Sequence, residues 1–397
     1  MIKFLHTADL HLGKVFHEHS LLEDQTHMLD QLGTILLDSS YGALLIAGDI
    51  YDRSIPSPEA VSLFGGFLEK LCAARPDLAV LVLPGNHDSA PRLGFGRELF
   101  AKLGVHIAAS PERAFEPVLV TQGGETCAFF LLPFLYPGCL EDPSTGEPVR
   151  SQGRLAELAA ARLSSAREAA VGEGASLTIL GAHLFTLGGR ESDSERIFLG
   201  TAEQVDAKLF AGFDYIALGH LHRFQRPAPN AGYSGSPLAY SFDEAVDTGT
   251  EEKVFLSVEL RPGAAPALNP IPVRPLRHLR RLRGSFNFFF RDSAENPALN
   301  EAAKDYLEIS LDDTALVENP LALLRGRFPH LLSIRQGEAF TRLAARDSGA
   351  AAETPSRKRS PAEDFADFLT GIYGEADPEK LALFGELLAE LEGGAEQ

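Results

Sequence analysis

The stretch Val80-Leu-Val-Leu-Pro-Gly-Asn-His-Asp88 joins a short apolar run to a polar turn. The apolar part, which begins at Ala79, has the length and the β-branched content of a buried strand. Gly85 permits a tight turn directly after it, and Asn86, His87 and Asp88 offer oxygen and nitrogen donors. Ligand sites in α/β sheets lie at the carboxyl ends of the strands. The stretch therefore predicts a functional edge in an α/β domain.

Four other apolar runs end in the same way. They are Ile2 to His6, followed by Asp9-Leu-His11; Ala43 to Ala47, followed by Gly48-Asp49; Leu177 to Leu180, followed by His183; and Tyr215 to Leu218, followed by Gly219-His220-Leu221-His222. Because such strand ends converge on one edge, we expect the five loops to form one pocket. Its donors are Asp, Asn and His without a thiolate, which suits manganese, iron or zinc.

The first 260 residues predict a layered α/β domain, because short apolar runs alternate with amphipathic stretches. Further strands are expected at Val105 to Ala108, Ala128 to Leu132 and Val254 to Val258. Helices are expected at Leu21 to Leu37 and at Pro58 to Ala74, where Ser57 is positioned to cap the helix and Pro58 to begin it. The turn-forming residues from Arg261 to Pro270 predict an exposed connector.

The rest of the chain predicts a smaller α+β domain and a helical end. Tyr306 to Leu311 alternates at a strand period, and Leu316 to Arg327 predicts a helix. The stretch 344–361 has the composition of a flexible linker. Beyond it, the apolar spacing predicts two short helices, at 365–372 and 381–391, that pack on the body or dock on a partner. We expect the divisions 1–273, 274–343, 344–361 and 362–397.

Composition excludes several classes of protein. A chain of 397 residues with 45% hydrophobic and 23% charged residues is neither a small stapled scaffold nor disordered. Three widely spaced cysteines give no disulfide framework, and no apolar run reaches about 18 residues, so a cytoplasmic location without membrane contact is expected. With 36 basic and 55 acidic residues, the net charge is −19. A polyanionic substrate would therefore need locally supplied positive charge.

The ordered motifs resemble those of the calcineurin-like metallophosphoesterase superfamily, which run Asp-x-His, Gly-Asp, Gly-Asn-His-Asp/Glu, a lone His, then Gly-His-x-His. The resemblance implies a layered β-sandwich flanked by helices and a site for two divalent ions. One ion would be held by Asp9, His11, Asp49 and His222, and the other by Asp49, Asn86, His183 and His220. His87 would be the catalytic histidine, oriented by Asp88. Two ions and two ligand aspartates leave a local charge of about +2, which attracts phosphate.

Further stretches resemble the SbcD family of bacterial nuclease subunits. They are Ile50 to Ser57, Ser192 to Arg196, Tyr233 to Pro237 and Ser241 to Glu244. This resemblance implies manganese-dependent 3′–5′ exonuclease action on double-stranded DNA and endonuclease action on single strands and hairpins. It also implies a cap domain, a homodimer, and C-terminal helices that bind an SbcC-type coiled-coil ATPase. Asp52 stands where archaeal and eukaryotic relatives have a histidine, and that role is not transferred; a turn or helix-capping role is at least as plausible.

Charge patterns offer DNA-contact hypotheses. Six arginines and no acidic residue lie between positions 274 and 291, which predicts a phosphate-binding patch that includes Arg277, Arg280 and Arg281. The alternative is a solvated charged face. Lys14, Arg223 and Arg226 adjoin the metal motifs and are candidates to guide a strand. From Ala351 to Gln397, 11 acidic residues face 4 basic ones, which favours a protein partner over DNA.

Two other functions are consistent with the same motifs. One is a phosphatase or small-molecule phosphodiesterase of the same superfamily, which would have no need of a cap domain and helical tail. The other is a scaffold that keeps the fold without catalysis, against which the intact ligand set counts.

Overall fold

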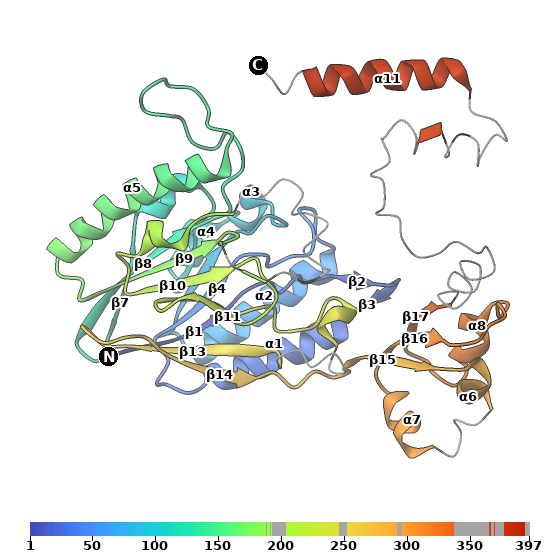
Figure 1. The fold of residues 1–397 in the computed structure, drawn as a ribbon. Helices are drawn as coiled ribbons and strands as arrows, with labels where there is room; N and C mark the ends of the chain where they lie inside the picture. Colours follow the sequence, from blue (N-terminus) through green and yellow to red (C-terminus); the bar gives the residue numbers. More distant parts are fainter. Residues whose placement is uncertain are drawn as a thin grey trace. The chain divides into compact units, whose positions relative to one another are not determined.

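Two six-stranded sheets form the centre of the fold in the computed structural model (Figure 1). The structure describes residues 1–187, 189–190, 192, 204–245, 252–291, 296–336, 365–366, 369 and 377–393. The chain divides into two units, Met1–Ala339 and Phe340–Gln397, and each is described by itself.

The first sheet has the strand order β14-β13-β1-β4-β5-β6. These strands are β1 (Ile2–Thr7), β4 (Ala43–Ala47), β5 (Ala79–Leu83), β6 (Val105–Ile107), β13 (Val254–Leu260) and β14 (Ala267–Pro272). β1, β4, β5 and β6 are mutually parallel, whereas β13 is antiparallel to both of its neighbours. The parallel strands therefore place their carboxyl ends at one edge.

The second sheet has the order β11-β12-β10-β9-β8-β7. Its strands are β7 (Val118–Gln122), β8 (Glu125–Leu132), β9 (Leu177–His183), β10 (Tyr215–Gly219), β11 (Gln225–Ala228) and β12 (Ala231–Tyr233). β8, β9, β10 and β12 are parallel, and the outer strands β7 and β11 are antiparallel to their neighbours.

The two sheets pack face to face, which confirms the predicted layered sandwich. One buried cluster combines alternate residues of both sheets, including Phe4 and Leu45 from the first and Phe129 and Ile179 from the second. The rings of Phe4 and Phe129 meet edge to face with centroids 5.3 Å apart. Side chains on alternate positions of each strand therefore fill the space between the sheets, as the twofold period of a strand requires.

Helices cover the outer faces of both sheets. α1 (Leu22–Leu36) and α2 (Pro58–Ala74) pack on the first sheet, and α5 (Gln152–Gly172) packs on the second. α2 begins as predicted, because the Ser57 hydroxyl accepts a hydrogen bond of 3.2 Å from the amide of Ala60. Short elements complete this part: β2 (Val15–Phe16), β3 (His19–Ser20), α3 (Ala90–Leu93), α4 (Arg97–Ala101), and the 3₁₀ helices Pro111–Phe115, Ala207–Phe210 and Phe242–Glu244.

The predicted connector from Arg261 to Pro270 is wrong in its second half. Ala267–Pro272 forms β14, which pairs with β13 in a register that places Leu256 opposite Pro270. An edge strand tolerates proline because only one of its sides needs hydrogen-bond donors. The turn-forming residues therefore mark the edge of the sheet as well as a loop.

A three-stranded parallel sheet follows β14. It comprises β15 (Leu279–Gly284), β16 (Tyr306–Leu311) and β17 (Leu331–Arg335), with α6 (Phe286–Phe290), α7 (Pro297–Ala302) and α8 (Pro320–Arg325). Phe289, Leu307 and Phe328 belong to its own buried cluster. β16 matches the predicted strand, but the helix expected from Leu316 is shorter, because Asn319 adopts a left-handed backbone with φ 47° directly before Pro320. The boundaries at 273 and 343 stay predictions.

The second unit contains the helix α11 (Pro378–Gly393). Phe384 of this helix stacks on Phe365, with ring centroids 4.2 Å apart. Of the predicted linker 344–361 nothing is described, and of the helix expected at 365–372 only Phe365, Ala366 and Leu369 are, all three helical. No helix among the described residues is long and apolar enough to cross a bilayer.

Candidate metal centre

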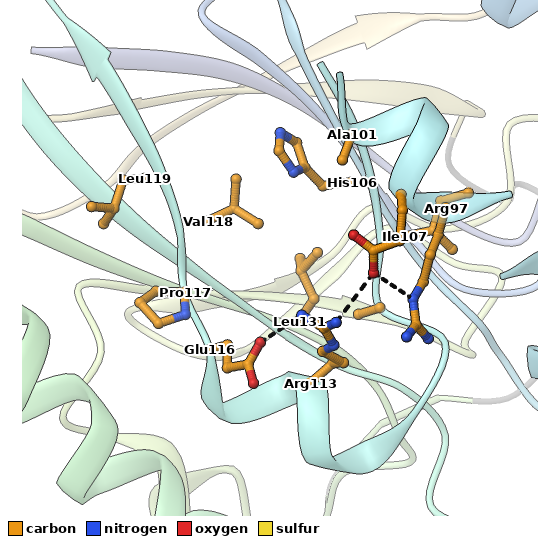
Figure 2. A pocket seen from close by; sticks show the side chains of 12 residues that line it. Arg97, Ala101, His106, Ile107, Arg113, Glu116, Pro117, Val118, Leu119 and Leu131 are labelled. Carbon is orange, nitrogen blue, oxygen red and sulfur yellow. Dashed lines mark hydrogen bonds and ion pairs between the residues drawn. The ribbon is translucent and has the colours of Figure 1, made fainter. Parts of the chain in front are cut away.

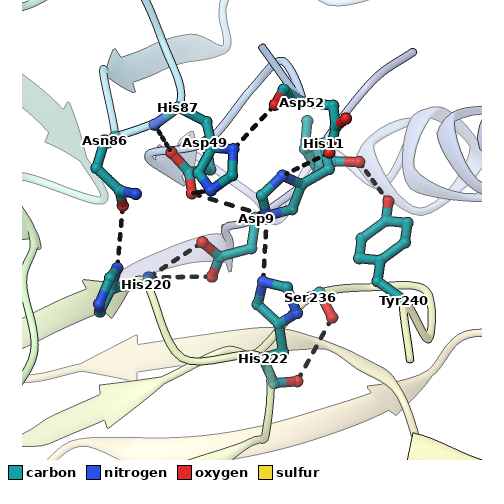
Figure 3. A network of polar contacts seen from close by, with 12 residues as sticks. Asp9, His11, Asp49, Asp52, Asn86, His87, His220, His222, Ser236 and Tyr240 are labelled. Atoms are coloured by element: carbon teal, nitrogen blue, oxygen red, sulfur yellow. Dashed lines mark hydrogen bonds and ion pairs between the residues drawn. The ribbon is translucent and has the colours of Figure 1, made fainter. Parts of the chain in front are cut away.

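The five predicted loops meet at one place, but they come from two sheets. Asp9, Asp49 and Asn86 follow β1, β4 and β5 of the first sheet, and His220 follows β10 of the second (Figure 3). His183 ends β9 of the second sheet. The loops after β1 and β4 are joined by backbone bonds, since the amide of Asp9 donates to the carbonyl of Gly48 at 3.0 Å. The site therefore lies where the carboxyl ends of two facing sheets meet.

Three glycines make this convergence possible. A Cβ on Gly85 would lie 2.0 Å from the Oδ1 atom of Asp49, and a Cβ on Gly219 would lie 1.8 Å from the carbonyl oxygen of Ala47. A Cβ on Gly48 would collide with the ring of His183. Only glycine permits so close an approach of backbone to ligand side chain.

One group of donors gathers around His11. Ligand atoms of Asp9, His11 and His222 all lie within 4.8 Å of one another. The Nε2 atoms of His11 and His222 are 3.1 Å apart, and Nε2 of His11 is 3.7 Å from Oδ2 of Asp49. Imidazole nitrogens and carboxylate oxygens that point to one spot are the donor set of a divalent transition-metal site.

A second group gathers around Asn86. Its Oδ1 atom lies 2.9 Å from Nε2 of His183 and 3.0 Å from Nδ1 of His220, and Oδ2 of Asp49 lies 3.6 Å from Nε2 of His183. Nδ1 of His183 is 2.9 Å from the carbonyl of Ala47 and donates to it. Nε2 of a neutral His183 therefore carries a lone pair that faces oxygen acceptors. A cation between these atoms satisfies all of them, so the residues fit a metal ion.

The protonation states are those of metal ligands. Burial lowers the pKa of His11 and of His220 to about 3, and it also lowers the pKa of His183. Burial alone would raise the pKa of the Asp49 carboxyl, but the neighbouring His183 and His87 outweigh it and hold that pKa below its usual range. Neutral imidazoles and ionised carboxylates are the forms that bind metals.

Backbone strain is concentrated at the same loops. Asp9, His11, Asp49 and His220 all have positive φ angles, of 55°, 44°, 50° and 103°. Residues other than glycine rarely adopt this region, and those that do cluster at functional sites. Four of the seven predicted ligands are therefore held in costly conformations by the surrounding packing.

Asp52 contacts the donor cluster in a way that the sequence did not reveal. Its carboxylate binds the Lys14 ammonium at 2.7 Å and lies 3.5 Å from Nδ1 of His11. Burial alone would raise the pKa of Asp52, but these two partners hold that pKa below its usual range. The turn or capping role considered for Asp52 is thus replaced by a contact behind a predicted ligand. Its position three residues after Asp49 on one loop was the available signal.

His87 lies at the site, but Asp88 does not orient it. Nδ1 of His87 donates to the backbone carbonyl of Asp52 at 2.9 Å, and the amide of His87 donates to Oδ1 of Asp49 at 2.9 Å (Figure 3). The Asp88 carboxylate instead accepts hydrogen bonds from three backbone amides, those of Ile50, Tyr51 and Gly85, at 2.9 to 3.0 Å. The prediction that Asp88 fixes the tautomer of His87 is therefore wrong, because Asp88 joins two loops and the Asp52 carbonyl orients the ring.

The residues predicted to contact DNA are all engaged by the protein itself. Lys14 binds Asp52, the Arg223 guanidinium lies 3.0 Å from Asp243, and the Arg226 guanidinium donates to the carbonyl of Pro229 at 2.5 Å. The three remaining arginines pair with carboxylates: Arg277 with Glu23 at 2.9 Å, Arg280 with Asp305 at 2.5 Å and Arg281 with Glu308 at 2.8 Å. The patch is thus compensated by acids from neighbouring elements, and its contact with DNA stays a prediction.

Two cavities lie outside the donor cluster. One, of about 350 Å³, lies beside β6 and β7, and its charged side chains pair among themselves, with Arg113 binding both Glu98 and Glu116 (Figure 2). The other, of about 740 Å³, is lined by residues of the sandwich, including Glu244 and Lys253, and by Leu279 and Tyr306 of the three-stranded sheet. Neither contains a predicted metal ligand among its lining residues.

Comparison with known proteins agrees with this site. The family model described as calcineurin-like phosphoesterase matches residues 2–224, and the chain belongs to that family. The family uses divalent metals, so the prediction of a metal-dependent phosphoesterase is confirmed.

The resemblance to SbcD is also confirmed. The chain is 29% identical over 335 residues to the SbcD component of the SbcCD nuclease from Staphylococcus epidermidis, covering 84% of this chain and 85% of that one. It is equally identical to the protein of the same name from Staphylococcus saprophyticus, covering 84% of each. Among solved structures, TT1561 of Thermus thermophilus aligns with 69% of this chain and 99% of its own at 15% identity and a TM-score of 0.39.

Proposed function

We propose that this protein is a manganese-dependent DNA nuclease that cleaves phosphodiesters at two metal ions. Its actions are 3′–5′ exonuclease cleavage of double strands and endonuclease cleavage of single strands and hairpins. The observation that carries the proposal is the position of Asp49, whose Oδ2 atom lies 3.7 Å from His11 on one side and 3.6 Å from His183 on the other. Similarity to relatives named as the SbcD component of the SbcCD nuclease supports DNA as the substrate.

The proposed ligand sets follow from the two donor groups. Asp9, His11, Asp49 and His222 hold one ion, and Asp49, Asn86, His183 and His220 hold the other, with Asp49 shared. Bound together, the ions supply an activated water and positive charge on the phosphoryl oxygens. Asp52 lies behind His11 and keeps the outer nitrogen of its ring directed away from the ion.

His87 is the proposed catalytic residue. Since its Nδ1–H donates to the carbonyl of Asp52, the ring is held with Nε2 toward the cluster, 4.0 Å from Oδ2 of Asp49. From there the imidazolium form of His87, which carries a hydrogen on each ring nitrogen, can donate a hydrogen bond from Nε2 to a phosphoryl oxygen or a proton to the leaving oxygen. The amide of His87 meanwhile binds Oδ1 of Asp49, so the same residue also fixes the shared carboxylate.

The charge of the site explains how an acidic protein attracts DNA. The chain carries a net charge of −19, which disfavours DNA binding at a distance. Two divalent ions and the carboxylates of Asp9 and Asp49 leave about +2 at the cluster, and the ion pair of Lys14 with Asp52 beside it adds no net charge. We infer that the partner ATPase supplies much of the remaining affinity for DNA.

The partner we propose is an SbcC-type coiled-coil ATPase, bound by the C-terminal helices. On α11, Leu383 and Leu387 lie four positions apart and are 59% and 51% exposed. Apolar side chains at this spacing form one face of a helix and suit a groove on another protein. Acidic residues dominate this part of the sequence, which favours a protein over DNA as the bound molecule.

A homodimer is proposed from a second apolar surface. Phe95, Leu99 and Leu103, in and beside α4, are 83%, 68% and 59% exposed. Exposed apolar side chains gathered in one short segment mark an interaction site. We also place the protein in the cytoplasm, which suits its three free cysteines, Cys72, Cys127 and Cys139.

Purified protein with Mn²⁺ should cleave hairpin DNA and linear duplex ends, with and without the partner ATPase. The same preparation should turn over p-nitrophenyl phosphate esters far more slowly. His87→Gln should bind both ions and lose about 10²- to 10⁴-fold in turnover, the usual contribution of an acid–base group. Rapid hydrolysis of the simple esters without DNA cleavage would favour the phosphatase alternative, and absence of bound metal would favour the scaffold.

A further inference from the structure

Three predicted histidine ligands share one arrangement, in which Nε2 points into the cluster and Nδ1 points to an acceptor outside it. For His183 the acceptor is the carbonyl of Ala47, hydrogen-bonded at 2.9 Å, and for His11 it is the carboxylate of Asp52, which lies 3.5 Å away without a hydrogen bond. For His222 it is the carboxylate of Glu244, with Nδ1 3.7 Å from Oε1. Glu244 differs because it belongs to none of the five metal motifs.

Glu244 is held firmly in place. It is buried, its Oε1 atom accepts a hydrogen bond of 3.1 Å from the Ser241 hydroxyl, and its Oε2 atom accepts one from the Lys253 ammonium. Ser241 and Glu244 are joined by a 3₁₀ turn, and Lys253 directly precedes β13. A carboxylate with both oxygens bound has a fixed orientation, so it can impose one on the ring beside it.

Lys253 binds the other end of the same ligand. Its ammonium donates to the backbone carbonyl of His222 at 2.8 Å and to the hydroxyl of Ser236 at 3.0 Å. The amide of Ser236 in turn donates to the carbonyl of His222 at 3.2 Å. One ion pair, with Glu244 buried and Lys253 partly buried, therefore contacts both the ring and the backbone of His222.

We propose that Glu244 and Lys253 are positioning residues for His222, setting the tautomer and direction of its ring and thereby the affinity of the ion that His222 binds. The inference rests on the proposed function, since it requires metal at the site. Carboxylates behind histidine ligands commonly change metal affinity by about 10- to 100-fold. The prediction concerns only the ion that His222 binds. The ligands of the other ion, Asn86, His183 and His220, are hydrogen-bonded to one another, to the carbonyl of Ala47 and to the hydroxyl of Tyr136.

A neighbouring cavity allows the effect of the Glu244 carboxylate on His222 to be tested separately from the contribution of Glu244 to packing. Glu244 and Lys253 line the cavity of about 740 Å³ that lies between the sandwich and the three-stranded sheet. In Glu244→Ala the lost carboxylate leaves a space next to this cavity, beside the Lys253 ammonium. Acetate is a carboxylate of the right size to occupy it.

The experiment is titration of the full-length protein with Mn²⁺ by calorimetry. Glu244→Ala should bind one of two ions about 10- to 100-fold more weakly and the other unchanged, and acetate should restore much of the loss. The matched control is Glu252→Ala, because Glu252 lines the same cavity without a place in the hydrogen-bond network around His222. That variant should bind both ions like the wild type and should not respond to acetate.

Wild-type affinity for both ions in Glu244→Ala would overturn the inference, as would equal weakening that acetate does not reverse. If the alanine variant fails to fold, Glu244→Gln decides: a several-fold loss for one ion supports the role, and wild-type binding overturns it. Failure of the proposed function gives different results. A wild type that binds Mn²⁺ but cleaves no DNA overturns the nuclease proposal alone, and a wild type that binds no Mn²⁺ overturns both.

Discussion

The Nε2 atoms of His11 and His222 lie 3.1 Å apart, although the two residues are 211 positions apart in the sequence. Each ring directs its Nδ1 atom to a carboxylate outside the cluster, that of Asp52 or Glu244. Unless one Nε2 carries a hydrogen and donates it to the other, two nitrogen lone pairs face each other in a buried place, and a cation between them removes the repulsion. The fold therefore holds the two rings in an arrangement that a metal ion stabilises.

Removing metal should consequently destabilise the folded protein. An ion that binds only the folded state adds about 2.7 kcal/mol to the free energy of unfolding when it is present at a hundredfold excess over its dissociation constant. Denaturant unfolding with Mn²⁺ and with a chelator measures this difference. In Asp49→Asn, which weakens the shared carboxylate, the difference should shrink; an equal free energy of unfolding in the wild type under both conditions would contradict the prediction.

Asp88→Asn should mainly lower the free energy of unfolding and have a smaller effect on turnover. Asp88 accepts three amide hydrogen bonds, from Ile50, Tyr51 and Gly85, and an asparagine would turn its own N–H toward one of these donors. Leaving a buried amide unsatisfied costs about 1–3 kcal/mol. The free energy of unfolding should fall by that amount, with a smaller loss of turnover than in His87→Gln. If Asp88→Asn kept the stability of the wild type but lost as much turnover as His87→Gln, Asp88 would instead have a role in the chemistry.

The metal-free protein should lose stability between pH 7 and pH 5. Burial lowers the pKa of His6, His11 and His220 to about 3, from an ordinary value of 6.5. Below about pH 6.5 the unfolded state binds protons that the folded state does not. The fraction of unfolded protein therefore grows as the pH falls toward 3.

Asp88 opposes this trend. Burial and the charge of Asp49 raise the pKa of Asp88 to about 7, so on acidification below that pH the folded state binds a proton that the unfolded state lacks until about pH 4. Three histidines outweigh one carboxyl, and the free energy of unfolding should decrease from pH 7 to pH 5. Denaturant titrations in chelator at the two pH values test the sign, and a constant or rising value would refute it.

Truncation after Ala344 should abolish binding of the SbcC-type partner, because α11 carries the exposed Leu383 and Leu387. Metal-dependent cleavage of simple substrates should continue, since every proposed ligand precedes residue 223. Co-purification and a cleavage assay provide the two readings. Leu383→Asp with Leu387→Asp in the full-length chain should reproduce the loss of binding, and a truncated protein that still binds the partner would remove this role.

The proposed dimer should depend on the apolar segment beside α4. Leu99→Asp places a charge on a surface that would otherwise be covered, so it should convert a dimer to a monomer in light scattering after gel filtration. Leu37→Asp is a matched control, because Leu37 is 57% exposed at the end of α1. A monomeric wild type, or a dimeric Leu99→Asp variant, would argue against this surface.

The sequence predicted the parts of the site that depend on local pattern. Each strand with its following loop is a continuous stretch, so the positions of Asp9, Asp49, Asn86, His183 and His220 after their strands were readable. The tight turn at Gly85 also followed from local residue type. Similarly, β4, β5 and α2 have the predicted bounds because their apolar runs begin and end sharply.

Contacts between distant stretches of the chain could not be predicted from the sequence. The allocation of the five loops to two sheets depends on strand pairing, which apolar runs do not specify. Glu244 and Lys253 come from outside the metal motifs, and the carboxylates that neutralise Arg280 and Arg281 come from Asp305 and Glu308 on or beside a neighbouring strand. A charge run shows its sign in the sequence, but its partners depend on the fold.

The division of the site between two sheets has a consequence for the newly made chain. His220, which follows β10, lies 211 positions after Asp9, so a growing chain contains Asp9 long before it contains His220 and His222. A growing chain thus lacks the second half of its catalytic apparatus until the sandwich is nearly finished. DNA-cutting capacity is in this way withheld until translation has passed the point at which the enzyme can fold around its cofactors.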